Sequence, residues 1–458
     1  MRETGTGRLF LSGAAALLAL TAVAALALAA HRATADTTGT TDADYAGAPL
    51  SAVAQLGKKL FFDVRLSASG RQSCASCHDP RTAYAPDNDL AVQLGGSDLK
   101  QPGIRAVPSL DYMETTPVFE IGPESLFEVE GATPATVASH PAGQSKASLA
   151  AQAAANPVPQ GGYFWDGRAD TLQDQPAGPL LSPFEMANPD VHSVVAKLQT
   201  ASYAADFKAL FGVHIFDDET MAMSEASFAM ARFEIEDPSF HPFSSKYDAY
   251  LAGKATLTAD EAAGLKLFED PKKGNCSSCH LDKADSDGRP PMFTDFEYEA
   301  LAVPRNPAIP ANADPKYFDV GICGPMRTDI YAQQAANCSL FKTPTLRNVA
   351  TRHVFFHNGV YGNLTDVVRF YVQRDTEPQN IYPKGQNGKV AKYNDVPQRY
   401  WPNVDTIDAP LDRHAGQPPA LDDHEIAQLV AFLKTLTDGY HPAREALSAA
   451  PPPSSPSS

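Results

Sequence analysis

The sequence is short of cysteine, tryptophan and positive charge. Among its 458 residues are 6 Cys, 2 Trp and 37 Lys or Arg against 54 Asp or Glu, which gives a formal net charge of −17. An acidic surface disfavours nucleic acid and anionic membranes as partners, because both carry the same sign of charge. We therefore expect no nucleic-acid partner, whereas a basic partner would suit the charge.

Long apolar runs are missing after the N-terminus. Leu9 to Ala30 is almost purely apolar, and Ala33-Thr34-Ala35 then offers a small-x-small cleavage pattern before Asp36. This order is typical of an export signal. We predict a signal peptide over 1–35 and a soluble mature protein in the periplasm. The alternative is a retained membrane anchor, because the run is nearly long enough to span a bilayer.

Strand patterns are also scarce, since alternation of apolar and polar residues is hard to find. The 38 prolines concentrate in stretches such as 80–160 and 282–345, which separate short segments with helical spacing. We predict a mainly α fold with long irregular loops. The expected helices are 52–62, 191–211, 221–235, 258–268, 364–372 and 424–435. Thr258 with Glu261 forms a capping-box pattern, and Asp422 or Asp423 is the expected cap of the last helix.

Two parts of the chain share a local order. Lys59-Leu60-Phe61 and Lys266-Leu267-Phe268 each end a predicted helix, and each is followed by a short loop and a Cys-x-x-Cys-His unit. A weak internal repeat of this kind predicts two related domains. We expect an N-terminal domain over 36–240, a C-terminal domain over 255–445 and a disordered Pro/Ser-rich tail over 446–458.

Four of the cysteines belong to those two units, Cys74-Ala-Ser-Cys77-His78 and Cys276-Ser-Ser-Cys279-His280. Two thiols at this spacing can add to the two vinyl groups of a haem, and the adjacent histidine can then bind the iron. A zinc site would need a second nearby pair of ligands, and a thioredoxin-like redox pair would need neither the histidine nor two copies. We predict two covalently attached c-type haems, with His78 and His280 as iron ligands.

The other two cysteines, Cys323 and Cys338, are separated by a short loop. In an exported protein such a pair is expected to form a disulfide. Two free thiols are the alternative.

Further motifs surround the two haem-attachment units. They are Leu60-Phe61-Phe62-Asp63 with Arg65-Leu66-Ser67, Phe164-Trp165-Asp166-Gly167-Arg168, Phe293-Thr294-Asp295, Lys342-Thr343-Pro344-Thr345-Leu346-Arg347-Asn348 and Phe356-His357-Asn358-Gly359. Through them the chain resembles the bacterial di-haem cytochrome c peroxidases and the related MauG enzymes, over most of residues 50–440. The resemblance implies two cytochrome c-like domains whose haems face each other across the interface.

The resemblance also implies that the haem bound by His78 is the peroxide site, with Gln175, Pro179 and Glu185 on its distal face. Peroxide must move a proton from one oxygen to the other before its O–O bond breaks, so we expect Glu185 to act as acid–base and Gln175 to orient the substrate. Trp165 resembles the tryptophan that conducts electrons between the haems. Without the resemblance, a surface Glu, a loop Gln and a core aromatic would be the simpler interpretation.

The second haem carries a departure from the typical peroxidases. Fourteen residues after His357 they have a methionine that ligates the second iron, and this chain has Tyr371 there, as the MauG enzymes do. A phenolate is a harder donor than a thioether and favours higher oxidation states of iron. We expect Tyr371 to be the second ligand of the His280 haem. Alternatively, Tyr371 is a core residue of helix 364–372 and Met326 is the ligand.

Two further departures concern activation and calcium. Many of these peroxidases cap the first haem with a loop histidine, and this chain has none between His78 and His140. We expect the first haem to be open to peroxide without prior reduction, unless His140 fills that role. The family's calcium site uses an asparagine at the position of Ala106 and carbonyls at those of Arg352 and Val354. The resemblance therefore implies that calcium is not expected here and that the Arg352 charge takes its place.

Three functions fit these features. The first is a peroxidase that reduces hydrogen peroxide with electrons from a small cytochrome c or cupredoxin. The second is a MauG-like oxidase that uses peroxide to modify Trp or Tyr of a partner protein. The third is a non-catalytic di-haem electron carrier, against which Glu185 and Gln175 count. A homodimer is possible for each.

Overall fold

The computed structural model describes residues 49–123, 157–285 and 288–442. The chain divides into two units, Met1–Pro49 and Leu50–Ser458, and every element below belongs to the second. The predicted signal peptide, the predicted tail and His140 lie outside the described residues. No helix within the described residues is both long and apolar enough to cross a membrane.

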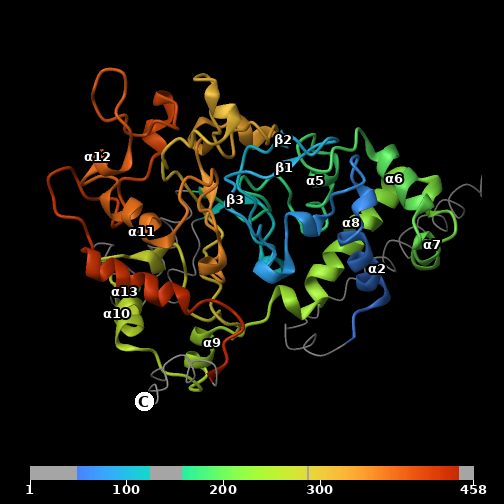
Figure 1. Ribbon diagram of the computed structural model, residues 1–458, viewed down its shortest axis with the longest axis horizontal. Coiled ribbons are helices and arrows are strands. Elements are labelled where there is room, and N and C mark those ends of the chain that lie inside the picture. Colours follow the sequence, from blue (N-terminus) through green and yellow to red (C-terminus); the bar gives the residue numbers. More distant parts are fainter. Residues whose placement is uncertain (1–48, 124–156, 286–287, 443–458) are drawn as a thin grey trace, which may run out of the picture. The chain divides into compact units, whose positions relative to one another are not determined.

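Helices are the main regular structure of the described residues and the strands are short (Figure 1), as the scarcity of strand patterns predicted. The helices are α2 Ala52–Phe61, α5 Ala177–Leu181, α6 Val191–Thr200, α7 Ala204–Phe211, α8 Glu219–Glu236, α9 Lys246–Leu251, α10 Ala259–Glu269, α11 Leu364–Gln373, α12 Pro378–Ile381 and α13 Asp423–Lys434. The strands are β1 Leu94–Gly95, β2 Gln101–Pro102, β3 Glu120–Pro123, β4 Pro157–Gln160, β5 Tyr298–Glu299 and β6 Phe341–Lys342.

The strands form three two-stranded antiparallel sheets. β1 pairs with β2, β3 with β4 and β5 with β6. The last pair aligns Tyr298 with Lys342 and joins two segments that are far apart in the sequence. Cys323 and Cys338 are bonded, which confirms the predicted disulfide.

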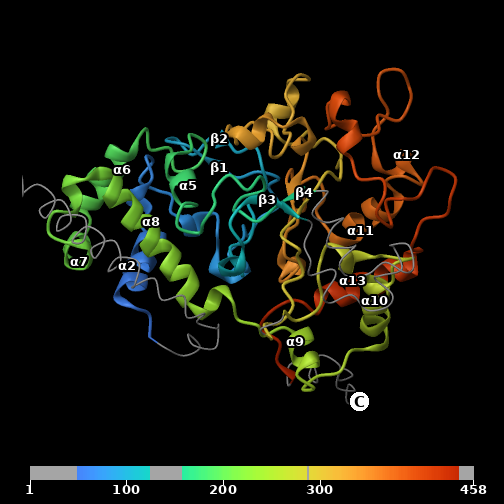
Figure 2. The ribbon, with the colours of Figure 1, turned by 180° about the vertical axis from the view of Figure 1, so that it is seen from behind.

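Helices α2 and α8 lie side by side in both ribbon views (Figures 1 and 2). They approach closely at Gly57, where an added Cβ would lie 1.8 Å from the carbonyl oxygen of Ala229. Leu56 and Leu60 of α2 pack with residues of α6 and α8 in one hydrophobic core. Glycine is needed at this crossing because no side chain fits between the two backbones.

A second pair, α10 and α13, repeats this arrangement (Figure 2). An added Cβ at Gly264 would lie 2.0 Å from the carbonyl oxygen of Gln428. Phe268 of α10 packs with Phe432 of α13 in a second core, with ring centroids 5.2 Å apart. The repeat seen in the sequence is thus a repeat of helix packing, and the proposed domain boundaries stay a prediction.

Capping residues fix two helix starts as predicted. Thr258 and Glu261 form a capping box at α10, and Asp422 and Glu425 form one at α13. These boxes satisfy backbone N–H groups of the first turn that have no partner inside the helix.

The predicted helix 191–211 is wrong in one respect, because it is two helices. Ala201 has an extended backbone after α6, and α7 begins at Ala204. The break lets Tyr203 become buried, and its hydroxyl donates a hydrogen bond of 2.7 Å to Asp63.

Candidate functional site

The first Cys-x-x-Cys-His unit lines a cavity of about 130 Å³. Cys74 begins a 3-10 turn that ends at Ser76, and Cys77 and His78 follow it. The Nδ1 atom of His78 lies 2.9 Å from the carbonyl oxygen of Tyr84. When Nδ1 carries the proton for this bond, Nε2 presents a lone pair that can bind a metal.

Gln175, Pro179 and Glu185 line the same cavity as Cys74, Cys77 and His78. Their segment runs through α5 and folds back on itself, since Met186 N–H donates to the carbonyl of Pro179 at 3.1 Å. The carbonyl of Glu185 accepts a hydrogen bond of 2.8 Å from Gly96, next to β1. These backbone contacts bring the three predicted side chains to one wall.

The carboxyl group of Glu185 is largely removed from water, and it lies near Arg168 and Ser182. Burial raises its pKa above the ordinary value, and the nearby Arg168 charge opposes that rise. A raised pKa brings a carboxyl group closer to the range in which it can both accept and return a proton near neutral pH.

Arg168 is fixed by contacts on two sides. Its guanidinium stacks 3.6 Å from the ring centroid of Phe164 and bonds to the Asp166 carboxylate at 2.9 Å. Asp166 is fully buried and also accepts a 2.7 Å bond from Arg105, whose other contacts reach Asp319 at 2.7 and 2.8 Å. This ion network links the Glu185 wall to residues of the other cavity, since Asp319 lines that one.

The turn from Phe164 to Arg168 places neighbouring residues in different cavities. Phe164 and Gly167 have positive φ angles, and a Cβ on Gly167 would lie 2.1 Å from the Tyr298 hydroxyl oxygen. Arg168 lines the first cavity and Trp165 the second. The indole N–H of Trp165 donates to the carbonyl of Ala106 at 2.8 Å.

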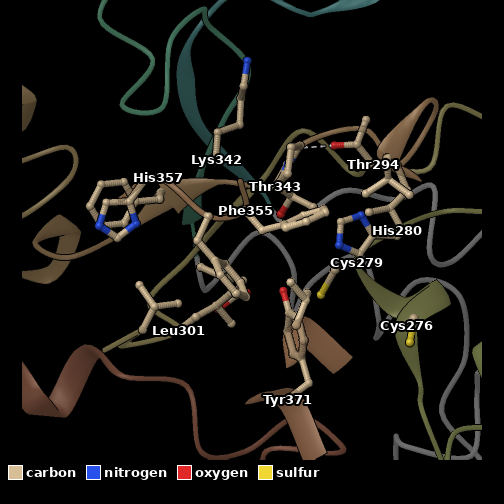
Figure 3. A pocket seen from close by; sticks show the side chains of 18 of the residues that line it. Cys276, Cys279, His280, Thr294, Leu301, Lys342, Thr343, Phe355, His357 and Tyr371 are labelled. Carbon is tan, nitrogen blue, oxygen red and sulfur yellow. Dashed lines mark hydrogen bonds between the residues drawn. The ribbon is translucent and has the colours of Figure 1, made fainter. Parts of the chain in front are cut away.

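The second Cys-x-x-Cys-His unit lines a cavity of about 280 Å³. Cys276 begins a 3-10 turn that ends at Ser278, and the Nδ1 atom of His280 lies 2.9 Å from the carbonyl oxygen of Phe293. Figure 3 shows Tyr371 extending from α11 with its hydroxyl directed into the space beside Cys279 and His280. Burial raises the pKa of the Tyr371 hydroxyl strongly.

The alternative ligand Met326 and the second tryptophan of the sequence, Trp401, do not line the second cavity. Met326 lines the first cavity, with Glu185, and not the cavity of His280. The side chain of Trp401 is 41% exposed and donates to the carbonyl of Val396.

The donor groups of both cavities fit c-type haem. Each has two free thiols and a histidine whose Nδ1 is held by a backbone carbonyl. Burial lowers the pKa of His78 and of His280 to about 4, so both imidazoles are neutral near pH 7, as an iron ligand must be. In the described residues no cluster of three or more His, Cys, Asp or Glu could hold a metal ion by itself.

Comparison with known proteins agrees with this donor set. The family model for di-haem cytochrome c peroxidase matches residues 51–256. The methylamine utilization protein MauG of Paracoccus denitrificans is 34% identical over 406 residues, which cover 86% of this chain and 91% of that protein. The chain belongs to the di-haem cytochrome c peroxidase and MauG family. Membership implies two c-type haems.

Other relatives include both branches of the di-haem peroxidase and MauG family. The cytochrome c551 peroxidase of Nitrosomonas europaea is 28% identical over 323 residues, covering 69% of this chain and 71% of that protein. The solved diheme peroxidase BthA of Burkholderia thailandensis is 38% identical and superposes with a TM-score of 0.71, covering 85% of this chain and 87% of its own. The resemblance seen in the motifs is thus confirmed, while the choice between peroxidase and MauG-like activity stays open.

Sequence reasoning missed several residues around this family's first site. Arg105 and Glu234 line the cavity of His78, and burial raises the pKa of Glu234 to about 8. Glu234 gave no signal because it lies on an ordinary helical segment, and Asp319 lies in a proline-rich loop without a motif. The Trp-Asp-Gly-Arg motif could have indicated Arg168 and Asp166, since an adjacent acid and base often form a buried pair.

Proposed function

We propose that the protein is a di-haem c-type peroxidase, which reduces hydrogen peroxide to water with electrons from a small redox protein. The observation that carries the proposal is that Gln175, Pro179 and Glu185 line one cavity with Cys74, Cys77 and His78. An electron carrier needs no acid–base group beside its iron, whereas peroxide cleavage does.

The haems, when bound, would supply the iron that takes up peroxide and the redox steps that pass electrons to it. The side chains supply the proton chemistry. One carboxylate oxygen of Glu185 accepts a proton from the inner peroxide oxygen and returns it to the outer one, so that water can leave. Two electrons and two protons balance the conversion of one peroxide to two waters.

Gln175 and Pro179 prepare the cavity for this transfer. The amide of Gln175 can donate to one peroxide oxygen and accept from the other, which orients the substrate. Pro179 has no N–H and adds an apolar surface, so it offers no competing donor. Arg168 keeps the Glu185 side chain in place through its charge and is itself fixed by Asp166.

We propose unequal roles for the two sites. His78 would hold the reactive haem, and His280 with Tyr371 would hold a second haem that supplies electron storage and delivery, with Trp165 as the conducting side chain. Trp165 supports this route because it lines the second cavity while its own turn carries Arg168 into the first. Cys74, Cys77, Cys276 and Cys279 attach the haems covalently.

A MauG-like oxidation of Trp or Tyr in a partner protein is the second candidate. It is favoured by Tyr371, whose hydroxyl faces the His280 cavity, and by the 34% identity to a MauG. In that case the partner protein, rather than a small cytochrome c or cupredoxin, supplies the two electrons for each peroxide. We place either reaction in the periplasm, on the strength of the N-terminal segment 1–35 and the haem-attachment units.

Peroxide-dependent oxidation of a reduced, basic small cytochrome c tests the proposed function. With the haem-loaded protein, we expect two cytochromes to be oxidised for each peroxide consumed, and Glu185→Gln to slow the reaction. The proposal is wrong if a protein that contains both haems oxidises the cytochrome no faster than free haem c does.

A further inference from the structure

Arg352 is a partly buried cation, and none of the described carboxylates is its partner. Its Nη2 atom donates a 2.7 Å hydrogen bond to the carbonyl oxygen of Val107. Buried arginines elsewhere in the described residues differ from it. Arg105 pairs with Asp166 and Asp319, and Arg347 with Asp248.

A buried charge without a counter-charge is costly, because one carbonyl dipole replaces only part of its hydration. The guanidinium has five N–H donors, and a single carbonyl uses few of them. The unused donors belong to a side chain that lines the cavity of Cys276, Cys279 and His280. An anion in that cavity would complete the site.

The chemistry of attachment decides which end of the cavity an anion occupies. Thiols bind the vinyl edge of a haem, and the two carboxylates of the haem stand on the opposite edge. Asp408 lines the cavity and precedes Ala409, whose carbonyl accepts a 3.0 Å hydrogen bond from Asn275, the residue before Cys276. An acidic residue therefore already lies near the cysteine end. Arg352 donates to the carbonyl oxygen of Val107, a residue that lines the cavity of His78, so its guanidinium lies on the side of the second cavity that adjoins the first.

The cavity has two further cations, Lys342 and Arg347, and both are already engaged. Arg347 pairs with Asp248, and Lys342 has a backbone partner. Its ammonium group donates to the carbonyl of Gly162 at 2.5 Å, and Figure 3 shows it directed away from Cys279 and His280. Asp166 adds a favourable charge for it. Arg352 is therefore the better receptor for a carboxylate.

We infer that Arg352 binds a carboxylate of the haem held by His280, and that its charge links this second site to the proximal side of His78. The inference rests on the proposed di-haem function. The bidentate geometry of a guanidinium suits a carboxylate. Because Arg352 also donates to the Val107 carbonyl, the ion pair would connect the second cavity to the backbone beside the first.

The test is the midpoint potential of each haem in Arg352→Met, measured by spectroelectrochemistry. Loss of a buried cation favours oxidised iron, so we expect at least one potential to fall by a tenfold change in the redox equilibrium, about 59 mV for one electron. Arg352→Lys should keep most of the wild-type potential. Arg71→Met is the matched control, because it removes the same charge from an exposed position near Cys74.

A haem count of two per chain in each variant shows that the proposed di-haem function still holds. With that count intact, potentials of Arg352→Met equal to those of Arg71→Met would overturn the inference alone. If Arg352→Met fails to bind haem, the structure of the haem-loaded wild-type protein decides. A guanidinium within about 2.9 Å of a haem carboxylate supports the inference, and one that faces only protein carbonyls overturns it.

Discussion

The two cavities share a helix pair, a 3-10 turn and a histidine, which we call the frame. They differ in the other side chains that line them. In each, a helix pair crosses at a glycine, Gly57 or Gly264, before the 3-10 turn of a Cys-x-x-Cys-His unit. In each, the histidine Nδ1 lies 2.9 Å from a backbone carbonyl. The frame therefore accounts for attachment of a cofactor and cannot account for a difference in chemistry.

The difference comes from segments outside the frame. The first cavity receives Gln175, Pro179 and Glu185 from the α5 segment, whereas the second receives Tyr371 from α11. A carboxylate that accepts and returns a proton suits bond cleavage, and a hard anionic donor suits the stabilisation of oxidised iron. One attachment frame can thus serve two roles, depending on which loop or helix closes it.

The largest expected effect is loss of one cofactor. Replacing Cys276 and Cys279 together by alanine removes both thioether bonds of the second site, so the haem content should fall from two to one per chain. The pyridine haemochrome assay measures this count. Replacing Cys323 and Cys338 by alanine is the control and should leave both haems, because that pair forms the disulfide.

The next effect concerns the first cavity alone. Glu185→Gln keeps the size of the side chain but removes its proton acceptor, and we expect peroxide turnover to fall by about 10²- to 10⁴-fold. Stopped-flow absorbance measures the rate. An unchanged rate would deny Glu185 its acid–base role and would make the two cavities chemically alike.

A third difference is the buried acid Glu234, which lines the first cavity. Its pKa of about 8 in the fold exceeds its ordinary value of 4.5, so its contribution to stability is fully present below pH 4.5 and is lost as pH rises toward 8. Glu234→Gln should remove this loss, gaining on the order of a few kcal/mol over wild type between pH 4.5 and 8.

Thermal or denaturant unfolding across that pH range checks the Glu234 prediction. The exposed Glu120→Gln is the control and should follow the wild-type profile. A constant difference between Glu234→Gln and wild type at all pH values would contradict the assigned shift.

The fourth prediction concerns the second cavity. Tyr371→Met should change the visible spectrum of the second haem and raise its midpoint potential by at least a tenfold redox change, about 59 mV, because a thioether stabilises oxidised iron less than a phenolate does. If Tyr371→Met leaves both the spectrum and the potential unchanged, Tyr371 is a core residue of α11 and not an iron ligand.

The sequence predicted the parts of this structure that are local. Helices with caps, such as α10 and α13, follow from side chains within one turn, and the disulfide follows from two cysteines in a short loop. The predicted helix 191–211 was wrong because burial of Tyr203, a tertiary contact, interrupts it.

At the candidate site, only the residues that belong to a sequence motif could be predicted. Gln175, Pro179 and Glu185 came from spacing within a family pattern, and the structure gathers them at His78. The ion network through Arg105 and Asp319 joins residues more than two hundred positions apart, so no local pattern could indicate it. Glu234 is likewise distinguished by burial and not by its neighbours in the sequence.

The central claim is that the first cavity reacts with peroxide and does so without prior reduction. Mixing peroxide with the fully oxidised, haem-loaded protein in a stopped-flow spectrophotometer tests it most directly. We expect a prompt change in the haem spectrum. Glu185→Gln should slow this change, and Tyr371→Met should leave its initial rate similar. A protein that stays inert until one haem is reduced, or that reacts equally fast without Glu185, would contradict it.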